Sequence, residues 1–251
     1  MKHLIILIIS LMSICSCNNE KRENNINSNN ESIANHIQLL SKKANELEFE
    51  CPKFDFKTNR VRADSIVKFF EKAKKSTGNK KIEFEKLFFC SFPNSFDKME
   101  SIFGFDSETG EPAVLYDYSG GPGGKNEGSM SHSIISYFAN LKSIPSDIYF
   151  DKYVNICVNG TWQADNIREG FDIYNRFEND TKLLCNVLSK RNQKEIYSVF
   201  RFIFDGPHPE NEFNDEIFNT IHPLISKENI ELGSALKRAY NDLITRSKHG
   251  H

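Results

Sequence analysis

Residues 192–203 read NQKEIYSVFRFI, and this stretch shows most clearly how the chain is expected to fold. Asn192, followed by Glu195 three residues later, fits a capping box, in which the two side chains satisfy backbone N–H groups at the start of a helix. Apolar residues then recur at steps of three and four, at positions 196, 199, 200 and 203. This spacing places them along one side of a helix, so the stretch predicts an amphipathic helix.

The same periodicity runs outward from this stretch in both directions. It predicts helices near 217–224 and 232–244 on the C-terminal side, and near 32–48, 66–73, 82–89, 95–103, 129–141, 145–158, 162–171 and 183–188 on the N-terminal side. Gly78, Pro93 and Gly104 are expected to end three of them. We predict a mainly α fold, a multi-helix globular domain over residues 32–248, with an α-solenoid as the alternative arrangement. Residues 113–118 are β-prone and would form at most a short hairpin.

The N-terminus has the order of parts found in a secretory signal. Lys2 gives a basic start, and residues 4–14 are almost wholly apolar. A transmembrane helix needs roughly 20 apolar residues, so this run is too short to span a bilayer and suits the apolar region of a signal peptide. It ends in the sequence ICSC, residues 14–17, which resembles the lipobox of bacterial lipoproteins. The resemblance implies a signal peptide over residues 1–16 and a lipid on Cys17, with Cys15 as the alternative site.

Residues 17–31 are expected to form a flexible tether behind that lipid. Seven of the thirteen residues from 18 to 30 are Asn, and one is apolar. Such a segment buries too little surface to offset its ordering entropy. The asparagine-rich composition also resembles lipoproteins of the Bacteroidetes. We therefore expect a protein of the bacterial cell envelope, anchored by acyl chains to the outer membrane or the periplasmic face.

Charge and cysteine content narrow the classes of partner. The net charge of −2 shows no excess of either sign, so nucleic acid is not an expected partner. An oxidising envelope permits two disulfides, in any of three connectivities, among Cys51, Cys90, Cys157 and Cys185. Three of the four lie among apolar residues at helical spacing, which favours buried free thiols instead. No zinc-ligand spacing occurs, so neither a metal nor a cofactor is expected.

Residues 119–128, SGGPGGKNEG, form a glycine-dense loop that we compare with a phosphate-binding loop. Gly124 and Lys125 match the end of that motif, but Asn126 replaces the Ser or Thr that would hold Mg²⁺. We therefore reject a nucleotide site. The loop is expected to be plainly flexible or, as the alternative, to contact a partner through Lys125 together with Tyr116 and Asp117 just before it.

The string FDGPHP, residues 204–209, offers a candidate for general acid–base chemistry. Asp205 and His208 would act as base and orienting residue. The favoured interpretation is a rigid turn, because one glycine and two prolines restrict the backbone there and no nucleophile is tied to the pair.

A second candidate site, with two acidic residues, surrounds the single tryptophan. If residues 162–169 are helical, Asp165 and Glu169 lie one turn apart on a face near Trp162, with Arg168 beside them. Such a group would suit a sugar platform or a glycosidase-like pair of carboxylates. A solvated helix face with an interfacial tryptophan is the favoured interpretation.

These patterns favour a binding protein over an enzyme. The leading hypothesis is a lipid-anchored interaction protein of the envelope, and its most concrete version is an immunity protein that neutralises a toxin. The alternative is an envelope hydrolase acting on glycan or peptide through Asp165, Glu169, Asp205 or His208. A third hypothesis is passive glycan or solute binding around Trp162.

Overall fold

The computed structural model describes residues 49–105, 112–116, 130–162 and 166–249. The chain divides into two units, Met1–Glu50 and Cys51–His251, and the fold given below is that of the second. The expected signal peptide, the lipidation site Cys17, the tether and the helix at 32–48 lie outside the described residues. No helix in the described ranges is long and apolar enough to cross a membrane.

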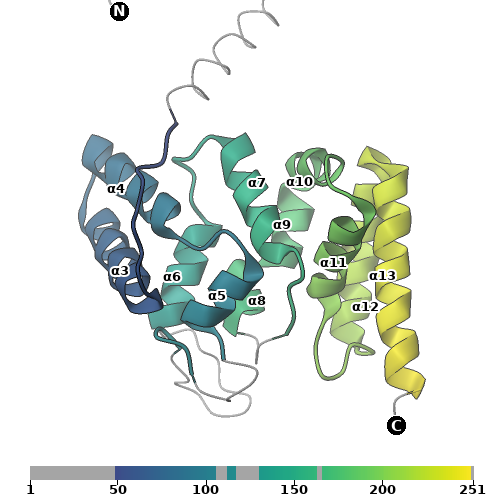
Figure 1. The fold of residues 1–251 in the computed structure, drawn as a ribbon. Helices are drawn as coiled ribbons and strands as arrows, with labels where there is room; N and C mark the ends of the chain where they lie inside the picture. Colours follow the sequence, from purple (N-terminus) through teal and green to yellow (C-terminus); the bar gives the residue numbers. More distant parts are fainter. Residues whose placement is uncertain (1–48, 106–111, 117–129, 163–165, 250–251) are drawn as a thin grey trace, which may run out of the picture. The chain divides into compact units, whose positions relative to one another are not determined.

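The second unit is built from helices, as the periodicity predicts (Figure 1). They are α3 (Asn59–Lys75), α4 (Gly78–Ser91), α5 (Phe96–Phe103), α6 (Met130–Ala139), α7 (Ser146–Cys157), α8 (Asn166–Phe171), α9 (Ile173–Asn179), α10 (Thr181–Leu188), α11 (Gln193–Phe204), α12 (Glu212–Glu228) and α13 (Ile230–His249). Over the described ranges, β pairing is confined to one isolated antiparallel bridge between Phe105 and Pro112. Residues 113–116 of the β-prone run form a turn instead of a strand, because the backbone N–H of Tyr116 bonds to the carbonyl of Ala113.

The helix ends show where local sequence determines the backbone. The capping box of α11 is confirmed: the Asn192 side chain accepts from the N–H groups of Lys194 and Glu195, each at 3.0 Å, and Glu195 accepts from the Asn192 N–H. The prediction that Gly78 ends a helix is wrong, because α3 stops at Lys75 and Gly78 begins α4. Its φ of 57° lies in the left-handed region that glycine adopts readily, which suits the tight connection between the two helices.

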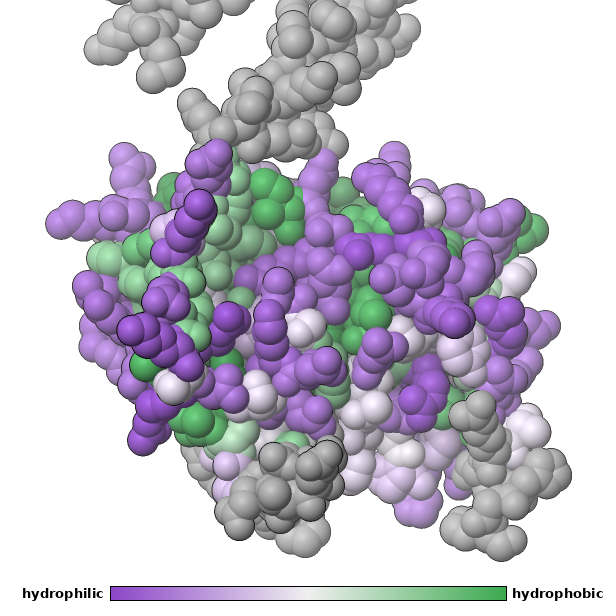
Figure 2. Space-filling model, viewed as in Figure 1, coloured by the Kyte–Doolittle hydropathy of each residue, from purple (hydrophilic) through white to green (hydrophobic). Residues whose placement is uncertain are grey.

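Aromatic side chains form much of the core. The rings of Phe92 and Phe138 stack with centroids 4.1 Å apart, and Phe138 lies 5.7 Å from Phe171. This cluster joins α6 and α8 to the segment after α4. Figure 2 shows that hydrophilic side chains cover most of the visible face, with apolar ones gathered over α3 and α4.

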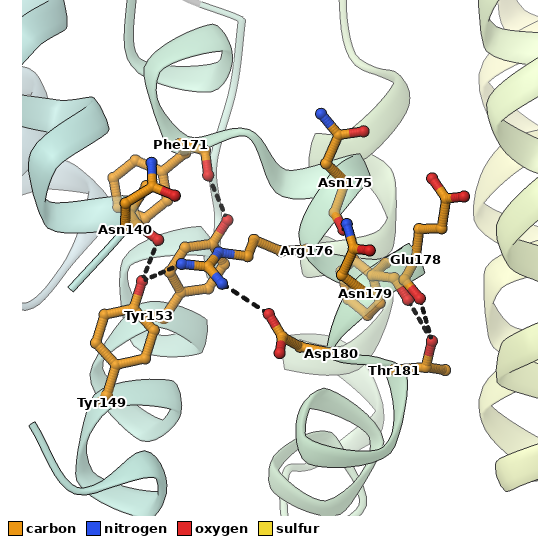
Figure 3. A network of polar contacts seen from close by, with 12 residues as sticks. Asn140, Tyr149, Tyr153, Phe171, Asn175, Arg176, Glu178, Asn179, Asp180 and Thr181 are labelled. Carbon is orange, nitrogen blue, oxygen red and sulfur yellow. Dashed lines mark hydrogen bonds and ion pairs between the residues drawn. The ribbon is translucent and has the colours of Figure 1, made fainter. Parts of the chain in front are cut away.

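Buried polar groups hold the short central helices in place (Figure 3). On α7, the Tyr149 hydroxyl donates to the carbonyl of Ala139 at 2.7 Å, and the Tyr153 hydroxyl donates to that of Phe171 at 2.6 Å. Arg176 pairs with Asp180 at 2.7 Å and lies 3.4 Å from the Tyr149 hydroxyl. The ends of α6 and α8 are therefore tied to α7 by hydroxyl groups whose burial requires such partners.

The expectation of four free thiols is wrong for one pair. Cys51 and Cys90 form a disulfide across 39 residues, whereas Cys157 and Cys185 are free and buried. Cys90 is only half-buried near the end of α4, so it lacks the fully apolar surroundings that its helical spacing suggested, and Cys51 is exposed in the segment before α3. The bond fixes the start of the domain to the end of α4.

The C-terminal helices are held by contacts with one another and with α7. α13 packs against both α11 and α12, and α7 packs against α10 and α11. Figure 1 shows α11, α12 and α13 side by side at the C-terminal end of the unit. This arrangement leaves one polar face of α11 open, and the candidate site lies there. The α-solenoid alternative stays a prediction.

Candidate functional site

A pocket of about 540 Å³ opens between the end of α7, the polar face of α11 and α13. Its volume lies within the range of small-molecule sites, roughly 300–1,000 Å³. The lining residues are Asn159, Gly160, Gln193, Lys194, Tyr197, Ser198, Arg201 and Arg238. Most of them come from α11, where steps of three and four residues align Lys194, Tyr197 and Arg201 along one face. We call this cavity the α11–α13 pocket.

Among the described residues that line the α11–α13 pocket, three have cationic side chains and none is acidic. In the described part of the chain, neither Lys194 nor Arg238 forms an ion pair, whereas Arg201 pairs with Asp205 at 3.0 Å. The guanidinium of Arg238 lies over the Tyr197 ring, 5.3 Å from its centroid. Tyr197 in turn donates its hydroxyl to Asp242 at 2.8 Å, which fixes the ring beneath Arg238. The pocket therefore combines positive charge with an oriented aromatic face.

The wall formed by the turn after α7 is closely packed. The backbone N–H of Asn159, a residue in the left-handed region at φ 58°, donates to the Ser198 hydroxyl at 3.1 Å. A Cβ on Gly160 would lie 2.5 Å from the Phe202 ring, closer than any side chain tolerates. The glycine therefore lets this turn approach α11, and together with the Asn159 bond it sets the width of the pocket.

Asp205 joins the inner end of the pocket to the segment before α8. One of its carboxylate oxygens accepts from Arg201, and the other accepts from the backbone N–H of Trp162 at 2.8 Å. Its main-chain carbonyl accepts from the guanidinium of Arg168. The structure thus brings together Trp162, Arg168 and Asp205, three residues singled out from the sequence. Both oxygens of the Asp205 carboxylate already have partners, which favours a structural role.

His208 lies apart from this group. Its side chain is 74% exposed, and its Nδ1 is 3.9 Å from a carboxylate oxygen of Glu210. Neither a hydrogen bond nor an ion pair joins His208 to Asp205, although both lie in the described part of the chain. This geometry favours the rigid-turn interpretation of residues 204–209.

The group proposed around the tryptophan is arranged differently from the expectation. Trp162 does not lie in the same helix as Glu169, because α8 begins only at Asn166. The bond from the Trp162 N–H to Asp205 holds that residue in a non-helical segment. Glu169 is exposed on α8, while Asp165, Asp117 and Lys125 lie outside the described residues. The Tyr116 ring packs on Phe105, with centroids 3.9 Å apart.

The residues that line the α11–α13 pocket were missed in the sequence. A signal for those on α11 was present, because Lys194, Tyr197 and Arg201 repeat at helical steps opposite the apolar stripe of the same stretch. Arg238 carries no such signal, since it reaches the site only through the packing of α13 on α11.

Within the described ranges, no group of three or more His, Cys, Asp or Glu side chains is placed to hold a metal ion. Searches against protein-family models, curated proteins and solved structures find no match to this chain.

Proposed function

We propose that this chain is a lipid-anchored binding protein of the bacterial envelope, and that the α11–α13 pocket is its binding site. The observation that carries the proposal is an open pocket in which Lys194 and Arg238, two cations that form no ion pair with another described residue, surround a fixed aromatic ring. Charged and aromatic groups placed in this way are typical of recognition sites. Attachment to the membrane rests on the lipobox resemblance around Cys17.

The contacts of Asp205 support binding over hydrolysis. A catalytic carboxylate must be able to accept or deliver a proton at the substrate. Both oxygens of Asp205 are instead held by Arg201 and by the backbone of Trp162. We therefore place Asp205 in the framework of the pocket. The most concrete version of the function is an immunity protein, in which the pocket receives a side chain or segment of an incoming toxin.

Co-purification with matched charge variants tests this proposal. The mature lipidated chain is used as bait against proteins secreted by neighbouring strains, alongside the double variant Lys194→Glu/Arg238→Glu. The control is Lys190→Glu/Lys237→Glu, which changes two exposed cations outside the α11–α13 pocket. We expect one partner that is retained by the wild type and the control and is lost by the pocket variant. A partner retained equally by all three proteins contradicts the assignment of the pocket.

A growth assay addresses the immunity version. Cells that lack the gene should be inhibited by the captured partner, and expression of the wild-type chain should restore growth. The Lys194→Glu/Arg238→Glu variant should not restore it. Equal growth of cells with and without the gene in the presence of the partner would remove the immunity version while leaving the binding proposal in place.

A further inference from the structure

We propose that the α11–α13 pocket recognises an oxyanion, a carboxylate or phosphate group, which binds between Arg201 and Arg238. This inference rests on the proposed function, since it names the chemical class of ligand for the same pocket. Its basis is the juxtaposition of three cations, Lys194, Arg201 and Arg238, from two helices around one cavity.

The positive charge of the pocket favours an anionic ligand. Lys194 and Arg201 stand on one face of α11, and Arg238 faces them from α13. Like charges brought together in this way repel one another, and a bound anion removes that repulsion. Asp205 and Asp242 contact residues of the pocket, but neither lines it: Asp205 is bonded to Arg201 and Trp162, and Asp242 accepts from Tyr197.

The two guanidinium groups are oriented before any ligand arrives. Arg201 is held by Asp205 at 3.0 Å, and Arg238 lies over the Tyr197 ring that Asp242 anchors. Groups that are already fixed lose less conformational entropy on binding. Arginine also offers paired N–H donors whose spacing matches carboxylate and phosphate oxygens.

Arg201 presents only part of its guanidinium to the pocket. Its Nε is buried and has no hydrogen-bond partner among the described residues. The side chain as a whole is 32% exposed, so its remaining N–H groups can donate to an oxyanion in the pocket. The pocket, at about 540 Å³, is also much larger than a single oxyanion, so the ligand has a body beyond its acidic group. A small acidic metabolite and an acidic protein side chain both fit this description.

The single tryptophan provides a reporter for the same site. The backbone N–H of Trp162 donates to the carboxylate of Asp205, which also accepts from Arg201. An anion that binds Arg201 adds negative charge beside the Asp205–Arg201 pair and so changes the electrostatic surroundings of Trp162. Trp162 as a residue has a relative exposure of 36%, so its emission is expected to respond to such a change.

The experiment is a titration of the mature chain with inorganic phosphate, citrate and a hexaglutamate peptide at low ionic strength. Trp162 emission and calorimetry measure binding, and circular dichroism verifies that each variant is folded. We expect at least one probe to bind saturably and to weaken as salt is added. Arg238→Gln should weaken binding about tenfold or more, as expected for a lost charge-assisted hydrogen bond. The matched control Lys237→Gln, one residue along α13 and outside the pocket, should bind as the wild type does.

The two sources of the oxyanion give different results. Tighter binding of citrate or phosphate than of hexaglutamate indicates a free small anion, and the reverse order indicates an acidic protein segment. The inference is overturned if no probe binds the wild type, or if Lys237→Gln loses as much affinity as Arg238→Gln. If no probe binds but the pocket variants still lose their partner in co-purification, only the oxyanion assignment fails. If co-purification is insensitive to the pocket variants, the proposed function itself fails.

Discussion

Gly233 of α13 lies against Ser226 of α12 so closely that a Cβ on the glycine would come within 2.9 Å of the Ser226 Cα. This close approach is where the last two helices meet, and α13 also carries Arg238 into the α11–α13 pocket. The interhelical contact thus connects the packing of the C-terminal helices to the geometry of the site.

The first prediction concerns Gly233→Ala. Alanine normally stabilises a helix by about 1 kcal/mol relative to glycine, but overpacking at a backbone contact costs roughly 1–3 kcal/mol. We expect a net loss of up to about 2 kcal/mol in the free energy of unfolding, measured by urea denaturation. Ser234→Ala, at the exposed neighbouring position, is the control and should change stability by less than about 0.5 kcal/mol. A Gly233→Ala variant more stable than the wild type would contradict this prediction, because it would show that α12 and α13 move apart at this contact at little cost.

Local sequence predicted those features whose partners lie within a few residues. Asn192 and Glu195 are three residues apart, so the capping box of α11 could be read directly. The bond from Trp162 to Asp205 spans 43 residues, and it keeps the tryptophan out of the helix that periodicity suggested. Lys152 likewise donates to the carbonyl of Phe92 at 2.7 Å across 60 residues. Contacts of this kind depend on tertiary packing, which no local spacing encodes.

The same limit applies to the candidate site. Sequence patterns assigned Trp162 and Arg168 to one candidate site and Asp205 to another, and the structure joins the three through the side chain and main-chain carbonyl of Asp205. The cationic pocket next to them was not predicted, because Arg238 comes from a helix whose position depends on contacts such as that between Gly233 and Ser226.

The second prediction is a pH dependence that originates at Tyr240. Its hydroxyl donates to the Asp215 carboxylate, and its ring stacks on Phe218 with centroids 4.3 Å apart. Burial first, and then the bond to Asp215, raise the pKa of Tyr240 to about 12. An unfolded tyrosine has a pKa of about 10. The neutral form is therefore favoured by folding, and its contribution is complete below pH 10 and is lost as the pH rises from about 10 to 12.

Comparison with Tyr240→Phe isolates this contribution from that of other tyrosines. The difference in unfolding free energy between wild type and variant should be constant below about pH 10 and should shrink above it, in urea titrations at successive pH values. The phenylalanine retains the stacking on Phe218, so the variant remains a folded control. A difference that stays constant up to pH 12 would show that Tyr240 titrates normally.

The third prediction concerns the disulfide between Cys51 and Cys90. A disulfide stabilises a fold chiefly by restricting the unfolded chain, and closing a loop of 39 residues should on this basis contribute about 4 kcal/mol. We expect Cys51→Ser/Cys90→Ser to lose most of this amount. Cys157→Ser is the matched control for a cysteine outside the bond, although its burial means that a hydroxyl there carries a cost of its own. A reducing agent should destabilise the wild type and leave the double variant unchanged.

The last prediction separates the structural and catalytic interpretations of residues 204–209. Asp205→Ala removes the acceptor for Arg201 and for the Trp162 N–H, and it should lower the unfolding free energy by about 1–3 kcal/mol and shift Trp162 emission. His208→Ala removes an exposed side chain and should leave both unchanged to within about 0.5 kcal/mol. Asp205→Asn retains an acceptor oxygen and should fall between them. A glycan- or peptide-hydrolysing activity that disappears in fully stable His208→Ala would instead establish the hydrolase alternative, because an exposed histidine with no structural role has no other way to affect turnover.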